Sequence, residues 1–403
     1  MSSDYIKQVT VTGDVSALVE DDKALEAWCE EVAKEIWEQR AELGVIHVQG
    51  LRASQRPQIF ANFILQRIAG APRITQNFQA ARAFFDTQNT GLGSLFLFRD
   101  ASAVQYYDKY SNTGYRQIRS GDDHHVGAAD VDGFTAQPFE TTFNFKTDFY
   151  RDDGTRDIAN QRTGYMLARF RLYGKELTFV NLALHSVPFE DVNEILSQIE
   201  VTKAAQKRQK QIDRLLADLE DEGLKNDAII VAGAFNSQLH ETKLLADLAH
   251  TQRGSTYART SENGRLEAIE QTDRHGRKTV TVEEHRFDLH SIHDWFFRLG
   301  RGQMVKKYNG ELAAVTFKGR LQEESVFFQP SRHYGINPEN RKEEFLRHLC
   351  PAWADRVLYN NVMSDLFRHD SFCASGLYYG LVGENAEIGE FKPVSLHATI
   401  CLK

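Results

Sequence analysis

The sequence predicts a mixed α/β fold in which two packed β-sheets are flanked by helices. Short β-branched runs alternate with segments of helical periodicity over residues 8–68. Two apolar segments between residues 164 and 184, separated at Gly174, predict a β-hairpin. The apolar run 228–232 has the shortness and the β-branched content of a buried central strand. Alternating strands and helices combined with strand hairpins are typical of two sheets packed between helical layers.

The N-terminal part predicts two strand–helix pairs and a further strand. The longer helix has apolar residues at Leu25, Trp28 and Val32, a spacing that buries one helical face, and we expect Gly44 to end it. Residues 106–139 are polar and rich in glycine, so they predict mostly loop. The predicted elements are a strand at 8–12, a helix at 22–43, a strand at 45–48, a helix at 55–68 and a strand at 94–98.

The rest of the chain predicts a long charged helix, a mainly helical insertion at about 251–329, and closing strands. No linker rich in proline, serine or glycine and no low-complexity run divides the 403 residues. We therefore predict a single domain over residues 1–403. The predicted elements in this part are strands at 164–172 and 176–184, helices at 192–219 and 241–249, and strands near 351–359, 376–382 and 394–401.

Composition and charge exclude several classes of protein. The chain has 41% hydrophobic and 26% charged residues, as ordinary globular proteins do, and a formal net charge of −8. That charge offers no basic surface for nucleic acid or an acidic membrane, and no apolar run is long enough to predict a transmembrane segment. The four cysteines are scattered without metal-ligand spacing, so we expect reduced thiols in a cytoplasmic protein. The first residues predict no secretory signal.

The strongest functional signal lies where the predicted central strand ends. Gly233 interrupts the apolar run, and the polar residues Asn236, Ser237 and Gln238 follow. Functional side chains gather at the exit of central strands in mixed α/β sheets. An enzyme that cleaves phosphate esters with a metal ion would have Asp and Asn here, to orient the reacting groups and to bind a phosphoryl oxygen. This sequence has the Asn, but Ala234 stands at the place of the carboxylate.

Several ordered motifs resemble those of the inositol polyphosphate 5-phosphatases, and more narrowly those of the type I inositol-trisphosphate 5-phosphatases. The Pro-Ala-Trp-x-Asp-Arg string at 351–356 is the most specific, because it is long and rare. The resemblance implies the four-layer αββα sandwich of the endonuclease/exonuclease/phosphatase type. The other matching strings are Phe179-Val180-Asn181-Leu182, residues 231–236, Lys392-Pro393-Val394, Thr12-Gly13-Asp14-Val15 and His47-Val48-Gln49, so the resemblance extends over nearly the whole chain.

The resemblance also identifies the catalytic positions, and most of them have lost their chemistry. The family hydrolyses a phosphate ester with Mg²⁺, and its Asp and His side chains activate and protonate the reacting oxygens. Its metal-binding Glu corresponds to Gly50, its phosphoryl-binding His to Ala183 and its catalytic Asp to Ala234. The family's Asp-His pair before the Lys-Pro-Val motif corresponds to Glu390-Phe391. We therefore expect no catalytic residue and no bound cofactor.

Remnants of a substrate site remain beside these losses. Gln238 replaces an Arg of the family, Thr163 a Lys and Ala354 a Cys. Asp14 stands where the family has Asn, and Asp14 and Glu390 are weak candidates for metal ligands. The remnants at substrate-binding positions are Asn236, Asp355, Arg356, Lys392 and Arg162, although we favour a structural role for Asp355 and Arg356 as a partly buried pair at the start of a strand.

These losses favour a pseudophosphatase that binds another protein or belongs to a multi-subunit assembly. The helical insertion and the long helix after Pro188 are the docking surfaces that we expect. Two alternatives remain open. The chain could bind an inositol phosphate or a phosphoinositide without cleaving it, through the cations Arg162, Arg169, Arg332, Arg356 and Lys392. It could also be an active Mg²⁺-dependent enzyme whose metal ligands have moved to Asp14, His185, Asp355 and Glu390.

Overall fold

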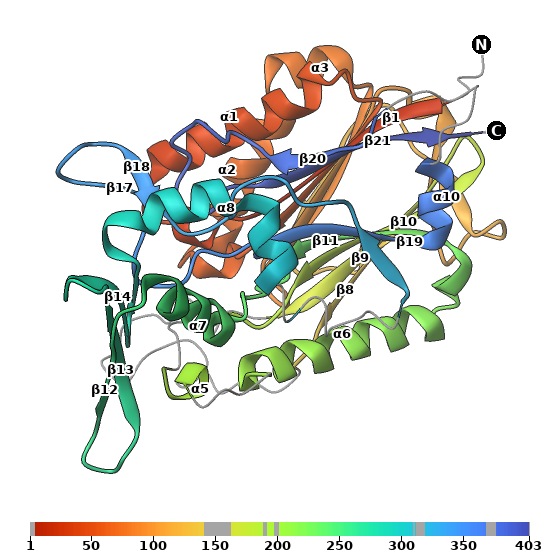
Figure 1. The fold of residues 1–403 in the computed structure, drawn as a ribbon. Helices are drawn as coiled ribbons and strands as arrows, with labels where there is room; N and C mark the ends of the chain where they lie inside the picture. Colours follow the sequence, from red (N-terminus) through yellow and green to blue (C-terminus); the bar gives the residue numbers. More distant parts are fainter. Residues whose placement is uncertain are drawn as a thin grey trace.

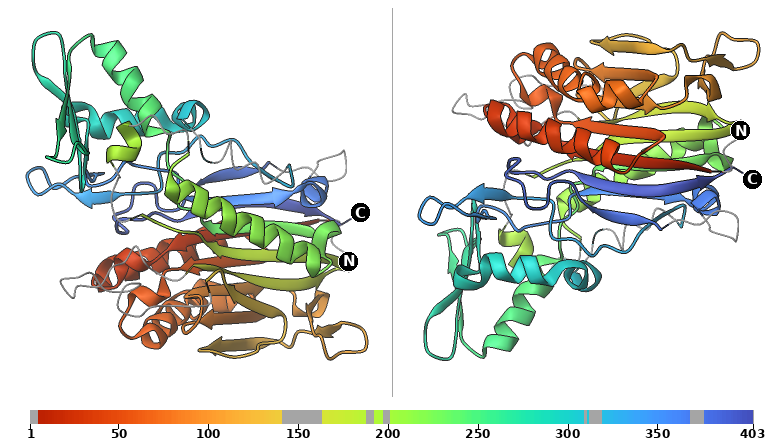
Figure 2. Two further views of the ribbon diagram at one scale, coloured as in Figure 1. Left: turned by 90° about the horizontal axis from the view of Figure 1, so that it is seen from below. Right: turned by 90° about the horizontal axis from the view of Figure 1, so that it is seen from above.

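Two β-sheets pack face to face, and helices cover both outer faces (Figure 1). The computed structural model describes residues 5–140, 163–187, 192–196, 201–308, 311, 319–367 and 376–402. Helices α1 (Asp22–Glu38) and α3 (Pro72–Asn77) lie over one sheet, and α6 (Lys203–Asp221) lies over the other (Figures 1 and 2). This order of layers confirms the predicted four-layer αββα sandwich. Within the described residues, no helix is long and apolar enough to cross a membrane.

The first and last strands of the chain meet in one seven-stranded sheet. Its strands are β1 (Tyr5–Asp14), β2 (Leu43–Gln49), β3 (Ala80–Asp86), β4 (Leu92–Phe98), β7 (Gly121–Val126), β20 (Tyr378–Leu381) and β21 (Val394–Cys401). Their order is β20-β21-β1-β2-β4-β3-β7, so both termini lie at the same end of the molecule (Figure 1). The pair β1 and β2 is parallel and places Asp14 opposite Gln49.

The second sheet contains the predicted hairpin and the predicted central strand. Its strands are β5 (Val104–Tyr107), β6 (Tyr115–Gln117), β8 (Phe134–Pro138), β9 (Gly164–Leu172), β10 (Lys175–Ala183), β11 (Ala228–Ala234), β16 (Leu321–Glu323) and β19 (Asp355–Asn360). Their order is β16-β19-β11-β10-β9-β5-β6, with β8 paired to β9. The register places Ala183 opposite Ala234, and Ala234 opposite Asp355. These three residues therefore form one row across the sheet.

The core between the sheets is rich in aromatic side chains. The ring centroid of Phe96 lies 4.6 Å from that of Phe170 and 5.3 Å from that of Phe179, so strands of both sheets interlock. On the outer face of the first sheet, α1 buries Trp28 completely, and Asp21 caps that helix by accepting a 2.9 Å hydrogen bond from Ala24 N. α2 (Pro57–Ala69) packs beside it. These contacts fix the two sheets as one rigid support for the loops at their edge.

The insertion between β11 and β16 is mixed, and the prediction that it is mainly helical is wrong for residues 256–288. These residues form a four-stranded antiparallel sheet that projects from the sandwich (Figure 1). The β-branched run 279–282 favours a strand over a helix. The elements of the insertion are α7 (Glu241–Gln252), β12 (Thr256–Thr260), β13 (Leu266–Thr272), β14 (Lys278–Glu283), β15 (Arg286–Asp288) and α8 (His293–Tyr308).

Short elements complete the chain. The hairpin of β17 (Tyr334–Ile336) and β18 (Glu343–Phe345) lies between the insertion and β19. Helix α10 (Asn361–Phe367) follows β19, and α5 (Val192–Leu196) precedes α6. The 3-10 turns are η1 (Ser16–Leu18), η2 (Leu51–Ala53), η3 (Ala101–Ala103), η5 (Leu224–Asn226) and η6 (His290–Ile292).

Several predicted boundaries are wrong. α1 ends at Glu38, and Gly44 lies inside β2, where it continues the strand instead of ending the helix. Residues 106–139 contain β6, β7 and β8 in place of the expected loop, and β3 was not predicted. The expected helix over 192–219 is divided, because Thr202 caps α6 by accepting a 3.1 Å hydrogen bond from Ala205 N.

The cysteines also differ from the expectation. Cys29 and Cys350 are buried thiols. Cys401 is disulfide-bonded, so the expectation that all four cysteines are reduced thiols is wrong for this residue. The expectation of a cytoplasmic protein therefore loses one of the observations on which it rested.

Candidate functional site

The site predicted from the motifs lies where strands of both sheets end. Ala183 and Ala234 are the last residues of β10 and β11, and Asp355 is the first residue of the antiparallel β19. Asp14 ends β1 in the other sheet. Asp14 and Asp355 both contact the guanidinium of Arg332, so the two sheet edges meet at one point.

Arg332 fills the centre of this site. Its Nε donates a 2.9 Å hydrogen bond to Oδ2 of Asp355, and its Nη2 donates a 2.7 Å bond to Oδ1 of the same carboxylate. Nη1 donates a 2.9 Å bond to Oδ1 of Asn236, and Nη2 lies 3.4 Å from Oδ2 of Asp14. The guanidinium carbon also lies 4.3 Å from the ring centroid of Phe391. One cation therefore binds two carboxylates, an amide oxygen and an aromatic face.

The Arg332 side chain is buried together with its main partner. Arg332 is 5% exposed and Asp355 is 0% exposed. Burial alone would lower the pKa of Arg332, but the carboxylates of Asp355 and Asp14 raise it above its usual value. Ser331 fixes the pair further, because its hydroxyl donates a 2.9 Å hydrogen bond to Oδ2 of Asp355. The result is a permanent positive charge held in place at the meeting point of the sheets.

Local backbone geometry aims Asn236 at Arg332. Asn236 has a φ of +52°, the left-handed conformation that asparagine tolerates better than most residues. Its amide nitrogen donates a 2.7 Å hydrogen bond to the carbonyl oxygen of Leu184, which leaves its Oδ1 free to face the guanidinium. Its backbone N–H donates to the carbonyl of Ala354 at 3.1 Å. The motif residue is therefore held rigidly, with the guanidinium of Arg332 as its partner.

Asp14 and Gly50 are matched to each other. The carboxylate of Asp14 accepts a 2.9 Å hydrogen bond from Ser16 N and lies against Gly50, whose φ is +81°. A Cβ atom at residue 50 would collide with Oδ1 of Asp14 and would lie only 2.9 Å from Ser16 N. The position that corresponds to the family's metal-binding Glu therefore has room for no side chain.

Curated relatives agree with the motifs. The chain is 21% identical over 397 residues to human inositol polyphosphate-5-phosphatase A, a match that covers 96% of this chain and 91% of the human protein. The canine protein of the same name is 21% identical over 324 residues, which cover 80% of this chain and 73% of that protein. No family model matches the chain. The chain is related to the inositol polyphosphate 5-phosphatases.

Solved structures include similar folds at low identity. The inositol polyphosphate 5-phosphatase domain of a synaptojanin, in complex with inositol (1,4)-bisphosphate and calcium, is 12% identical, with a TM-score of 0.47 over 98% of this chain and 85% of that one. A nitrophorin from Cimex is also 12% identical, with a TM-score of 0.48 over 99% of this chain and 100% of that one.

Arg356 and Lys392, two of the expected remnants of a substrate site, form internal ion pairs. Nη1 of Arg356 lies 2.9 Å from Oε2 of Glu323, and its Nε donates to the carbonyl of Trp353. Asp355 and Arg356 thus have different partners, and the pair expected between them does not form. Nζ of Lys392 donates a 2.7 Å hydrogen bond to Glu343 and further bonds to the carbonyls of Glu384 and Ala386, while burial lowers its pKa. Arg162 lies outside the described residues.

Gln238, which was expected to replace an Arg of the family, contacts an arginine of α6. Oε1 of Gln238 accepts a 3.4 Å contact from Arg208 of α6. Arg208 is buried and paired with Glu311, whose Oε2 accepts a 2.9 Å hydrogen bond from Arg208 Nε. His185, a candidate for a relocated metal ligand, also lies against α6. Its backbone N–H donates a hydrogen bond to Oε1 of Gln211. Burial, Lys207 and Arg208 lower the pKa of His185 to about 4.

Glu390, the second weak metal candidate, has histidine partners. Its Oε1 lies 2.7 Å from Nδ1 of His333 and 3.2 Å from Nε2 of His348. Burial would raise the pKa of Glu390, but the two histidines lower it to about 2. Asp14 and Glu390 therefore belong to two adjoining clusters, one around Arg332 and one around His333.

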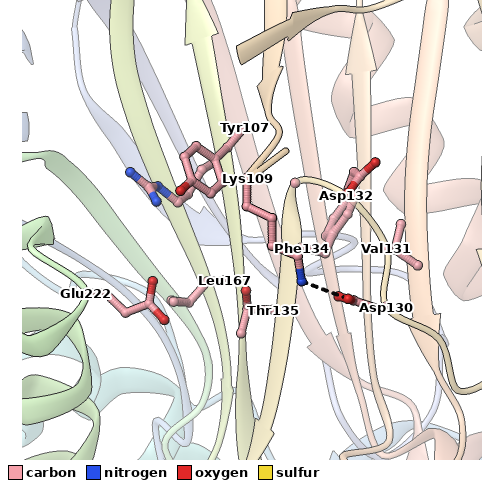
Figure 3. A pocket seen from close by; sticks show the side chains of 11 residues that line it. Tyr107, Lys109, Asp130, Val131, Asp132, Phe134, Thr135, Leu167 and Glu222 are labelled. Carbon is pink, nitrogen blue, oxygen red and sulfur yellow. Dashed lines mark hydrogen bonds and ion pairs between the residues drawn. The ribbon is translucent and has the colours of Figure 1, made fainter. Parts of the chain in front are cut away.

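A separate pocket is lined mainly by β8, β9 and the loops beside them (Figure 3). Arg169 is one of the residues that line it. The guanidinium carbon of Arg169 lies 4.0 Å from the ring centroid of Tyr107, and Lys109 forms a 2.8 Å ion pair with Asp130. Asp132 and Glu222 add further carboxylates to the lining. An excess of carboxylates over cations does not favour a phosphate ligand in this pocket.

Sequence reasoning found most members of the site but missed its centre. Arg332 was considered only as one of several cations, and His333 and His348 were not considered. Nothing local in Ser331-Arg332-His333 indicates a buried ion pair with residues 14 and 355.

Proposed function

We propose that this relative of the 5-phosphatases is a pseudophosphatase that works by binding another protein. The observation that carries the proposal is the guanidinium of Arg332 between Asp14, Asn236 and Asp355. Asn236 and Asp355 are two of the residues that the motifs of this chain share with the family. An internal cation has taken the oxygen ligands that a hydrolytic metal ion would need.

Replacing that cation with Mg²⁺ is unfavourable on physical grounds. Arginine cannot lose its proton in a protein, so its charge cannot be removed to admit a second cation. Moving the side chain away would break a bidentate ion pair with the fully buried Asp355, a loss of about 3–5 kcal/mol. Magnesium also prefers a nearly ideal octahedron of oxygen atoms, and Gly50 has no side chain that could supply one of them.

The proton-transfer groups are missing as well. Ala183 and Ala234 lie side by side at the ends of β10 and β11, and Phe391 lies against Arg332. None of the three side chains can donate or accept a proton. A general acid or base contributes about a hundred- to ten-thousand-fold in rate, so the joint loss supports an inactive protein.

The insertion offers a surface for a partner protein. Trp295 and Leu299 are one turn apart on α8 and are 60% and 62% exposed. We call Trp295 and Leu299 the α8 patch. Grouped exposed aromatic and aliphatic side chains favour a protein-binding role.

The first experiment measures phosphate release from soluble inositol trisphosphate and from phosphoinositide vesicles at saturating Mg²⁺. We expect the purified protein to release no more phosphate than its Asp355→Ala variant. Turnover by the unmodified protein that Asp355→Ala abolishes would overturn the proposal.

The second experiment tests the α8 patch. Native complexes are purified with the unmodified protein, with Trp295→Glu/Leu299→Glu and with Ile59→Glu as a matched control. Ile59 is 63% exposed, but it belongs to α2 on the outer face of the first sheet. We expect the double variant alone to lose its partner. Equal recovery of the same partner by all three proteins would place the interface elsewhere.

A further inference from the structure

His333, His348 and Glu390 form a compact cluster beside the Arg332 site. His333 precedes β17, His348 follows β18 and Glu390 precedes Phe391. One possible ligand atom from each residue can be chosen so that all three lie within 4.8 Å of one another. The ring centroids of the two histidines are 4.8 Å apart and cross at 66°. Three residues far apart in the sequence are thus brought together by the fold.

We propose that His333, His348 and Glu390 bind a divalent transition-metal ion of the zinc type. Two imidazole nitrogens and one carboxylate oxygen are a ligand set that suits Zn²⁺ and is poor for Mg²⁺, which prefers oxygen atoms only. The proposal is independent of the pseudophosphatase proposal, because it involves none of the positions that correspond to the 5-phosphatase catalytic residues other than Glu390.

The two distances between the histidines and Glu390 require only small side-chain movements. Tetrahedral ligands that are each about 2.0–2.1 Å from a zinc ion lie about 3.3–3.4 Å from one another. The present separations are 2.7 Å between His333 Nδ1 and Glu390 Oε1 and 3.2 Å between His348 Nε2 and the same oxygen. An ion that enters therefore replaces a direct contact between His333 and Glu390 by two bonds to the metal.

Backbone hydrogen bonds hold the three ligands in position. Tyr334 N donates a 2.9 Å bond to the carbonyl of Glu390, and Leu346 N donates a 2.8 Å bond to the carbonyl of His333. The pairing of Tyr334 with Phe345 closes the β17–β18 hairpin that carries the two histidines. Ligands on such a fixed frame lose little conformational entropy when a metal binds.

Local charge and exposure also favour a dication. Asp14, Asp355 and Glu390 carry three negative charges against the single positive charge of Arg332, so the adjoining clusters have an excess of two negative charges. The side chain of His348 is 38% exposed, whereas that of His333 is 12% exposed. A bound ion would therefore have three protein ligands and an open side toward solvent, where water or an anion completes its coordination.

The test uses the full chain after treatment with a chelator and removal of the chelator. Zn²⁺ is titrated by calorimetry, and Co²⁺ is titrated by visible absorption, which reports four-coordinate geometry. We expect one ion per chain with micromolar or tighter affinity and no competition from a large excess of Mg²⁺. His348→Ala and Glu390→Gln should each weaken binding at least about a hundredfold, since loss of an outer partner alone already costs 10–100-fold.

His275→Ala is the matched control, because His275 is exposed on a turn of the projecting sheet and is absent from the cluster. It should bind one ion with unchanged affinity. Zn²⁺ should also raise the melting temperature of the unmodified protein and of His275→Ala, and leave that of His348→Ala unchanged. Absence of stoichiometric binding to the unmodified protein, or equal affinity in His348→Ala and Glu390→Gln, would overturn the proposal. Either result would leave the phosphatase assay unaffected.

Discussion

Changing Arg332 to methionine removes the central cation but keeps much of the side-chain volume. The guanidinium makes two hydrogen bonds to Asp355, one to Asn236 and a contact with Asp14. Asp355 is 0% exposed, so its carboxylate would remain in a buried environment without a counter-ion. Removing one partner of a buried pair costs about 3–5 kcal/mol. We expect Arg332→Met to lower the free energy of unfolding by that amount.

Chemical denaturation followed by fluorescence and circular dichroism measures this loss. Arg67→Met is the control, because the Arg67–Glu26 pair on α2 and α1 is about half exposed and should contribute less than about 1 kcal/mol. Arg332→Met/Asp355→Asn should recover part of the loss, with a coupling energy of about 1–3 kcal/mol. A loss under about 1 kcal/mol for Arg332→Met, or no coupling with Asp355, would refute the role given to this pair.

Three further predictions concern the surrounding structure. Gly50→Ala should destabilise the protein more than Gly174→Ala. Both glycines have φ above +80°, but only at Gly50 would a Cβ atom collide with Asp14 and Ser16. Equal free energies of unfolding in urea for the two variants would contradict this. Burial lowers the pKa of His47 to about 3. Below pH 6.5, His47 is therefore protonated in the unfolded chain but stays neutral in the folded protein. The contribution of His47 to stability should therefore fall by about 2 kcal/mol between pH 7 and 5, and His47→Phe should weaken the pH dependence of unfolding by that amount. Glu323→Gln should cost about 2–3 kcal/mol by leaving the buried Arg356 without its counter-ion, and thermal unfolding like that of the unmodified protein would count against it.

The sandwich could be predicted because its strands carry their own signal. The run 228–232 and the hairpin at Gly174 are local patterns of apolar residues and turn residues, and both appear as β11 and as β9–β10. The projecting sheet was missed although β14 carries a β-branched run, because β12 and β13 are largely polar and pairing decides their conformation. β7 was missed for the same reason, since its Gly-Asp-Asp-His-His run becomes a strand only beside β3.

The site shows where a sequence motif stops being informative. The strand register brings the motif positions Ala183, Ala234 and Asp355 side by side. The counter-ion of Asp355 could not be predicted, because Arg332 reaches it through a segment that precedes β17 and has no regular pattern. The pairing of Glu390 with His333 and His348 likewise depends on tertiary contacts between loops. The partners of Asp355 and Glu390 are determined by tertiary contacts, and a sequence motif contains no information about these contacts.

The central claim is that Arg332 occupies the place where a hydrolytic metal ion would bind. Anomalous diffraction from crystals soaked in Mn²⁺ tests it most directly, because manganese can replace magnesium and scatters anomalously. We predict the guanidinium between Asp14, Asn236 and Asp355 and no anomalous peak within bonding distance of the two carboxylates. An Mn²⁺ ion bound by Asp14 and Asp355, with Arg332 displaced, would contradict the claim.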